Sequence, residues 1–429
     1  MNSNLISTSK SVFLIALHGV FVLLIYYIFL FLDFSEPTFN IGKLKNFDGG
    51  WLFSIVENGF IYNENGQSNI AFFPLFPMIW KFLGVDQISI CLINYVFYGS
   101  GLVILQKLWR FDNKFLLVSL SIPSAIFFYL PYTESLFFLT CALLLYGLDR
   151  STPLAVIGMF LACFSRSASF VFIPIIIITC LFNLDFSTKN YKKLGLLLLA
   201  CLSSFFLSQY YQYFDTGKYL GTFAVQKFWN REMNVPQLFF TTWDSGRLIW
   251  LDGLAFLIGI LALYFSLLFL IRKIKNKRGS VRESLLFSIG YLGLITITSA
   301  IYTGVDAAGG TTLLSINRYV FATPFFVVFL SYLTKPDLVR MKHVIFFLLF
   351  SLSIWSCFGF WDEIRNVIPN ERSQISTKLY FLVVTLYSFI YLLISKSKYK
   401  QLLWSGLYFF NVILQMVLFN YFIRAVWVG

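Results

Sequence analysis

The apolar residues of this 429-residue chain fall into blocks of about twenty, separated by short polar segments. A helical block of that length spans a bilayer, whereas the strands of a membrane β-barrel alternate over about ten residues. The pattern predicts an all-α polytopic membrane protein, a single domain over 1–429 with about 11–13 transmembrane helices. The thirteen blocks lie near 11–32, 88–108, 114–130, 132–148, 153–165, 168–184, 194–213, 248–271, 283–303, 318–334, 343–360, 378–395 and 402–423.

Composition supports this interpretation and narrows the chemistry. Hydrophobic residues make up 58% of the chain and charged residues only 12%, which is too apolar for a surface in water. The six cysteines all lie in apolar blocks, and His18 and His343 stand far apart, so neither a disulfide framework nor a zinc site is predicted. Any reaction would have to use carboxylates, guanidinium groups, amides and hydroxyls.

The net charge of +13 indicates orientation rather than nucleic-acid binding. If the N-terminus is cytoplasmic and the blocks alternate in direction, every dense cluster of lysine and arginine falls in a cytoplasmic loop, as the positive-inside rule requires. The segments left on the other side are 33–87, 214–247, 304–317 and 361–377. We therefore expect an integral, multi-pass membrane protein with membrane lipid, and no nucleic acid, among its partners.

The pattern of the first outer loop, 33–87, predicts two short interfacial pieces: a helix that lies in the membrane interface, and a second piece that lies on the surface or is re-entrant. Apolar residues recur at helical spacing from Trp51 to Phe60, directly after Asp48. The later stretch 71–81 holds Pro74 and Pro77, which make a full span unfavourable. A carboxylate at such a helix start is well placed to take a proton from a hydroxyl, although Asp48 could equally serve only as the helix cap.

Two motifs carry a resemblance to a known family. The first combines 47–51, Phe-Asp-Gly-Gly-Trp, with 71–77, Ala-Phe-Phe-Pro-Leu-Phe-Pro, and the second is 130–137, Leu-Pro-Tyr-Thr-Glu-Ser-Leu-Phe. Together they resemble the GPI mannosyltransferase 2 (PIG-V) family and its prokaryotic relatives. Weaker matches follow at 165–167, 224–229 and 317–319, so the resemblance runs to about Pro324.

The resemblance implies a GT-C type membrane glycosyltransferase that uses a polyprenyl-phosphate sugar, typically mannose, on the non-cytoplasmic face. By position it implies that Asp48 is the catalytic base. The acceptor would be a lipid-linked or small saccharide, since the outer loops are small, and the membrane would be a prokaryotic plasma membrane rather than the endoplasmic reticulum. One departure is Ser165-Arg166-Ser167-Ala168, where relatives are expected to have an Arg-Ser-Asn-Gly type sequence.

Five further residues are candidates for substrate binding, namely Glu134, Arg166, Gln226, Trp229 and Arg318. Arg166 and Arg318 lie at the outer ends of predicted spans, where guanidinium groups could hold phosphate oxygens. The alternatives for both are snorkelling or an ion pair with Glu134 or Asp306. Glu134 could bind the acceptor or could simply stabilise the start of its helix. Gln226 and Trp229 could contact sugar hydroxyls or belong to the interfacial aromatic belt.

No Asp-x-Asp pair occurs in the sequence, and we predict no cofactor and no required metal, because arginine alone can hold a lipid monophosphate. A transporter or flippase for polyprenyl-linked glycans or lipids is the alternative function. That function needs polar groups near the bilayer midplane, whereas the ionisable residues here concentrate at the outer ends of the blocks. The pattern favours the enzyme.

Overall fold

The computed structural model describes most of the chain. The described residues are 8–32, 34, 40–167, 169–182, 188–237, 249–275, 281–305, 311–313, 315–334, 390 and 398–429. The predicted blocks 343–360 and 378–395 lie outside them, except for Ile390. So do Asp306 and His343.

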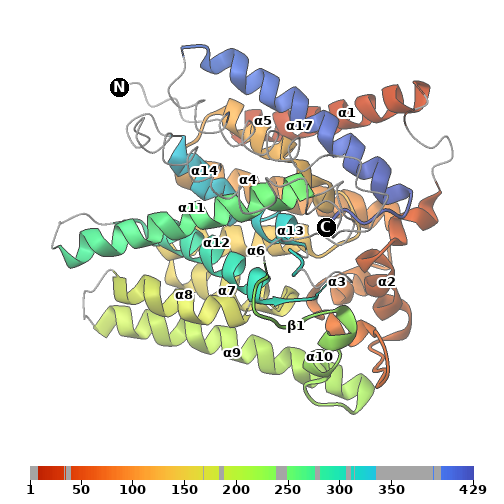
Figure 1. Ribbon diagram of the computed structural model, residues 1–429, viewed down its shortest axis with the longest axis vertical. Coiled ribbons are helices and arrows are strands. Elements are labelled where there is room, and N and C mark those ends of the chain that lie inside the picture. The colour runs from red at the N-terminus through yellow and green to blue at the C-terminus, as the bar shows by residue number, and fades with distance from the viewer. Residues whose placement is uncertain are drawn as a thin grey trace.

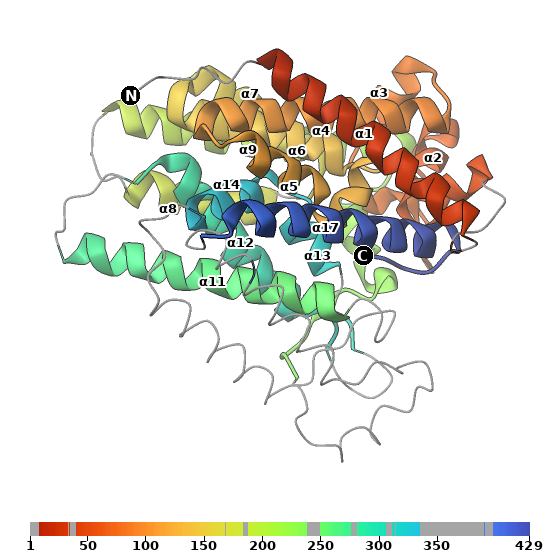
Figure 2. The same ribbon diagram turned by 90° about the horizontal axis from the view of Figure 1, so that it is seen from above.

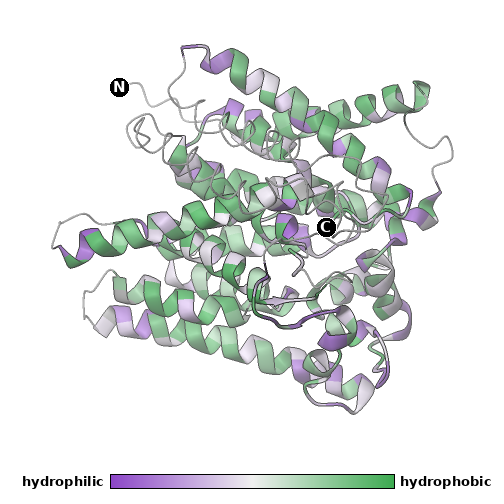
Figure 3. Ribbon diagram, viewed as in Figure 1, coloured by the Kyte–Doolittle hydropathy of each residue, from purple (hydrophilic) through white to green (hydrophobic). Residues whose placement is uncertain are grey.

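Long apolar helices lie side by side and form the body of the molecule (Figure 1). Among the described residues, six helices are long and apolar enough to cross a membrane, and α7, α8 and α14 are shorter apolar helices. Hydrophobic residues cover most of their length, and hydrophilic residues gather toward the helix ends (Figure 3). The protein is therefore an all-α polytopic membrane protein. The helices are α1 (Thr8–Phe31), α4 (Gln87–Trp109), α5 (Asn113–Ser121), α6 (Glu134–Arg150), α7 (Thr152–Ser165), α8 (Ser169–Phe182), α9 (Thr188–Thr216), α11 (Ile249–Ile274), α12 (Glu283–Ile301), α13 (Ile316–Phe321), α14 (Pro324–Leu333) and α17 (Lys400–Ile423).

Two predicted blocks are interrupted at proline, which lacks the N–H group of a helical hydrogen bond, whereas Pro174 lies inside the continuous helix α8. Block 114–130 divides at Pro123 into α5 and the 3-10 helix η3 (Pro123–Phe128), and block 318–334 divides before Pro324 into α13 and α14. The side-chain amide of Gln415 in α17 donates to the carbonyl oxygens of Leu120 and Ile122 at 3.0 and 2.9 Å. A neighbouring helix thus satisfies the carbonyls that the break leaves free.

Helices α6 and α7 form a tight antiparallel hairpin, with Ser151 between them. A side chain on Gly147 would collide with the backbone of Ala155, and one on Gly158 would collide with the backbone of Leu144. Small residues allow this close approach of two helices. Because the hairpin is antiparallel, its open end brings the start of α6 beside the end of α7. In the view from above, α6 and α14 lie between α7 and α11 (Figure 2).

Short elements gather at one end of the bundle, on the right of Figure 1. The two predicted interfacial pieces are present there as the helices α2 (Asp48–Asn58) and α3 (Leu75–Leu83), with 3-10 helices η1 (Ile41–Lys45) and η2 (Asn69–Ala71). The middle outer loop adds α10 (Gly221–Ala224), η4 (Gln226–Trp229) and β1 (Glu232–Met233). Strand β1 pairs antiparallel with β2 (Tyr302–Thr303), with Glu232 opposite Thr303. We call this the site end.

Ion pairs mark the other end of the bundle. Lys193 of α9 contacts Glu283 of α12 at 2.6 Å, and Arg282 contacts Asp149 of α6 at 3.2 Å. Arg282 also donates to the carbonyl oxygen of Leu108 in α4. The ends of α4 and α6 therefore lie with the beginnings of α9 and α12, as alternating directions require. We call this the opposite end.

Candidate functional site

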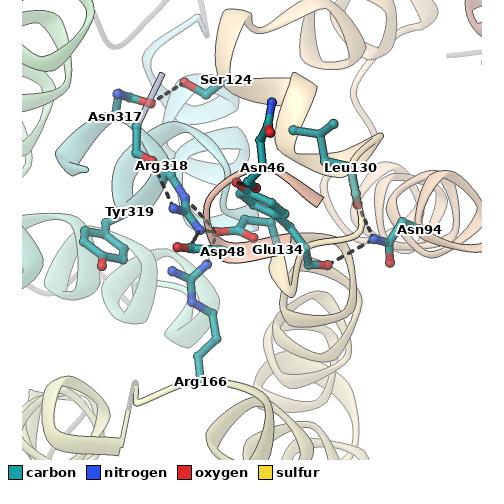
Figure 4. A network of polar contacts seen from close by, with 12 residues as sticks. Asn46, Asp48, Asn94, Ser124, Leu130, Glu134, Arg166, Asn317, Arg318 and Tyr319 are labelled. Atoms are coloured by element: carbon teal, nitrogen blue, oxygen red, sulfur yellow. Dashed lines mark hydrogen bonds and ion pairs between the residues drawn. The ribbon is translucent and has the colours of Figure 1, made fainter. Parts of the chain in front are cut away.

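Four charged residues that the sequence singles out meet at the site end (Figure 4). Arg318 of α13 contacts Asp48 of α2 at 2.8 Å and Glu134 of α6 at 2.6 Å. Arg166, which follows α7, contacts the same Glu134 at 2.6 Å. The ion-pair alternative is therefore confirmed for both arginines with Glu134. We call Asp48, Glu134, Arg166 and Arg318 the charged cluster.

Arg318 is the most fully bonded member of the charged cluster. Its Nε and Nη2 both donate to Glu134 Oε1, Nη2 also donates to Asp48 Oδ2, and Nη1 donates to the carbonyl oxygen of Gly429 at 3.0 Å. The guanidinium lies over the rings of Phe127 and Tyr132, 4.8 and 5.0 Å from their centroids. Four of the five N–H groups of this arginine are thus in use, which fixes the orientation of its guanidinium.

Glu134 joins the two arginines. Its side chain is fully buried, and Oε1 accepts all three of the N–H groups that the arginines direct at it. The second oxygen, Oε2, is buried and has no hydrogen-bond partner among the described residues. Glu134 is also the acid in the first turn of α6, so the predicted helix-start role and the ion pairs occur together.

Asp48 begins α2 but does not cap it. The N-cap residue is Phe47, and the Asp48 carboxylate bonds to Arg318 instead, so the capping alternative is wrong. Phe47 has φ 53°, a conformation that a bulky residue rarely adopts. Its ring packs edge-on against Trp427 at 5.0 Å. This packing holds the strained turn that directs Asp48 inward.

The two glycines after Asp48 are required by close packing of α2 on η1. A Cβ atom on Gly49 would lie 2.7 Å from the carbonyl oxygen of Leu44, and one on Gly50 would lie 2.6 Å from that of Lys45. Such distances are far below van der Waals contact. The Asp-Gly-Gly sequence is thus explained by the geometry that brings the carboxylate to the charged cluster.

Arg166 is the more accessible arginine. Its side chain is 17% exposed, as is that of Asp48, whereas Arg318 is 5% exposed. Backbone φ −152° and ψ 160° end α7 at this residue and turn it out of the helix. Its guanidinium lies 5.5 Å from the ring centroid of Phe137 and 5.3 Å from that of Tyr319.

Gln226 and Trp229 lie nearby but make no contact with the charged cluster through the interactions that the structure describes. The Gln226 amide donates to the carbonyl oxygen of Thr222, within its own loop. Trp229 packs edge-on against Trp51 of α2 at 5.3 Å and Phe72 at 5.6 Å. The middle loop therefore covers α2 one turn beyond Asp48, and a substrate role for these two residues stays a prediction.

Sequence reasoning missed several residues that support the charged cluster. Asp252 in α11 accepts from the backbone N–H and the side-chain amide of Asn317, at 3.1 and 2.8 Å, and so holds the residue before Arg318. An acidic residue inside an apolar block is a signal that could have found it. Arg231 donates to the Tyr319 hydroxyl at 2.6 Å; Tyr319 belongs to the match at 317–319, and Arg231 lies two residues after the match at 224–229.

Both acids of the charged cluster, Asp48 and Glu134, form ion pairs with arginine. Within the described ranges, no group of three or more His, Cys, Asp or Glu side chains could hold a metal ion. The arrangement instead offers a carboxylate beside fixed positive charge, which suits proton transfer and the binding of an anion.

Comparison with protein-family models, curated proteins and solved structures finds no match to this chain. The fold and the site define the class: a multi-pass membrane protein with a charged cluster buried at one end of its helix bundle. The resemblance to the PIG-V family stays a prediction.

Proposed function

We propose that the protein is a membrane glycosyltransferase. It transfers a sugar, mannose by the family resemblance, from a polyprenyl-phosphate donor to a lipid-linked or small saccharide acceptor. The observation that carries the proposal is the environment of Asp48, a partly exposed carboxylate that a buried arginine holds at the start of an interfacial helix. A base and a fixed cation are the two groups that sugar transfer from a phosphate needs.

In the proposed reaction, Asp48 takes the proton of an acceptor hydroxyl. Asp48 Oδ2 accepts from Arg318, whereas Oδ1 has no hydrogen bond to any described residue and can receive that proton. The acceptor oxygen then bonds to the anomeric carbon from the face opposite the phosphate. The bond from the anomeric carbon to the phosphate oxygen breaks, its electron pair leaves with polyprenyl phosphate, and the configuration inverts.

Positive charge beside the departing phosphate would lower the barrier. As phosphate leaves, negative charge grows on its oxygens, and a guanidinium that is already in place stabilises that charge without reorganisation. Arg166 is the arginine of the charged cluster with side-chain exposure matching that of Asp48. Arg318 keeps the carboxylate in position.

The charge distribution supports a site on the non-cytoplasmic face. The basic residues Lys193 and Arg282, which the positive-inside rule assigns to the cytoplasm, lie at the opposite end of the bundle. The charged cluster lies at the other end of the same helices. A lipid-phosphate donor in the outer leaflet would reach it at headgroup depth.

Transfer can be tested with membranes that contain the protein. Labelled polyprenyl-phosphate mannose and a lipid extract should yield a labelled product, and Asp48→Asn should abolish the product at an unchanged protein level. Asp86→Asn is the matched control, since Asp86 is an exposed acid that caps α4 and asparagine also caps helices well. Full transfer by Asp48→Asn would overturn the assignment of the base. Labelled donor that crosses the bilayer unchanged would support a transporter instead.

A further inference from the structure

Tyr319 is shared by two arginines, only one of which belongs to the charged cluster. Arg231 donates from Nη2 to the Tyr319 hydroxyl at 2.6 Å, and its guanidinium carbon lies 5.6 Å from the ring centroid. The guanidinium carbon of Arg166 lies 5.3 Å from the same centroid. Arg231 directly precedes β1, and the pairing of β1 with β2 fixes its backbone beside the end of α12.

The three arginines differ in how many donors they have left. Arg318 uses four of its five N–H groups within the protein, whereas Arg166 and Arg231 each make one side-chain hydrogen bond among the described residues. Arg318 has one N–H group left, so more than one bond to a ligand would require breaking bonds to Asp48, Glu134 or Gly429. Arg166 and Arg231 can bind a ligand without breaking any.

The local excess of positive charge also favours an anionic ligand. Arg166, Arg231 and Arg318 contribute three positive charges, and within the described ranges Asp48 and Glu134 are the acids that pair with them. Arg231 forms no ion pair with any residue in the described part of the chain. Partly buried positive charge without a counter-charge favours an anionic ligand, and guanidinium forks match phosphate oxygens especially well.

We propose that Arg166 and Arg231, placed around Tyr319, bind the phosphate group of a lipid phosphate. Arg318 is then a positioning residue, which holds Asp48 and Glu134 rather than the ligand. The identity of that lipid as the product of sugar transfer rests on the proposed function, whereas the anion site itself rests on the unused donors. Both guanidinium carbons lie within 5.6 Å of the Tyr319 ring centroid, on which the proposed site is centred.

The test measures binding rather than turnover. The purified full-length protein in detergent is titrated with farnesyl phosphate, with uncharged farnesol and with inorganic phosphate. Arg166→Gln and Arg231→Gln should each weaken farnesyl phosphate binding about tenfold or more, the effect of losing one charge-assisted bond. Arg424→Gln is the matched control, because Arg424 is an exposed arginine that follows α17 near the same end. It should bind like the unaltered protein.

Further measurements distinguish a change at the proposed site from a loss of the fold. Arg231→Lys keeps the positive charge but loses the paired N–H donors of the guanidinium, so it should bind farnesyl phosphate with intermediate affinity. Gel filtration and thermal unfolding establish that each variant is folded. Equal binding of farnesyl phosphate by the unaltered protein and Arg231→Gln would overturn the site, as would binding of farnesol as tight as that of farnesyl phosphate. Inorganic phosphate that binds with the same dependence on Arg231 would support the anion site and assign it to free phosphate.

The two proposals fail in different ways. If Asp48→Asn retains transfer while Arg231→Gln loses farnesyl phosphate binding, the base is wrong and the phosphate site stands. If Asp48→Asn abolishes transfer while Arg231→Gln binds normally, the enzyme stands and the phosphate site is wrong.

Discussion

At each end of the helix bundle, ion pairs join a set of two acidic and two basic side chains, but the two sets are connected differently. At the opposite end, Lys193 pairs with Glu283 and Arg282 pairs with Asp149, each across two helices. At the site end, one carboxylate oxygen of Glu134 serves two arginines, and one of these also holds Asp48. The first arrangement consists of separate pairs, and the second is a connected network.

The two ends also differ in exposure and in hydrogen bonding. At the opposite end Arg282 is 38% exposed and Glu283 is 24% exposed. Both oxygens of Asp149 accept hydrogen bonds from Ser284. At the site end Glu134 is fully buried, and its Oε2 has no partner among the described residues. Water can stabilise one member of each pair at the opposite end, whereas the pair of Glu134 with Arg318 at the site end is buried on both sides and depends on its protein partners.

The difference supports the site end as the place of the proposed reaction. Ion pairs such as Lys193 with Glu283 hold neighbouring helices together and contribute modestly to stability. At the site end, by contrast, a buried carboxylate oxygen of Glu134 has no hydrogen-bond partner among the described residues, which is unfavourable for stability. Features of this kind concentrate where a protein holds groups ready for a ligand.

Substitution of Glu134 should have the largest effect. Glu134→Gln leaves the buried Arg318 and the partly buried Arg166 without the counter-charge that they share, and we expect the free energy of unfolding to fall by about 3–5 kcal/mol. Glu283→Gln at the opposite end should cost about 1 kcal/mol or less, because its pair is partly exposed. Titration with a denaturing detergent in mixed micelles measures both. Equal losses for the two variants would contradict the distinction between the ends.

Replacement of Arg318 should come next. Lysine keeps the charge but cannot make the four bonds of the guanidinium, so Arg318→Lys should lower stability by about 2–3 kcal/mol. It should also reduce transfer at least tenfold while farnesyl phosphate still binds. Arg282→Lys is the matched control and should change stability by less than about 0.5 kcal/mol. Loss of farnesyl phosphate binding in Arg318→Lys would show that Arg318 holds the ligand directly.

The smallest effect is expected at Asp149. Asp149→Asn removes the charge opposite Arg282, while the amide oxygen can still accept from the backbone N–H of Ser284. We expect a loss of about 1 kcal/mol, with transfer unchanged. A stability titration and the transfer assay measure the two quantities. Reduced transfer in this variant would mean that the opposite end also controls the reaction.

Much of the fold could be predicted from hydropathy because burial in lipid dictates it. The predicted blocks 88–108 and 402–423 correspond to α4 and α17 within two residues at each end. The interruptions at Pro123 and Pro324 follow from the chemistry of proline. The short pairing of β1 with β2 was not predictable, since two-residue strands carry no periodic signal.

The site was predictable in its members but not in its connections. Sequence motifs placed Asp48, Glu134, Arg166 and Arg318 among the candidates. They could not show that Asp48 bonds to Arg318, 270 residues away, instead of capping its own helix. The Arg231 contact with Tyr319 depends on how the middle loop folds back, and local sequence does not encode that path.

The hairpin of α6 and α7 has a consequence for how the chain enters the membrane. Glu134 and Arg166 are 32 residues apart and close one hairpin, so their opposite charges can neutralise each other as soon as these two helices meet. Moving a joined pair through hydrocarbon is far less costly than moving two separate ions. The close helix contact at the glycines thus lets Glu134 enter the membrane already paired with Arg166, before Arg318 has been synthesised.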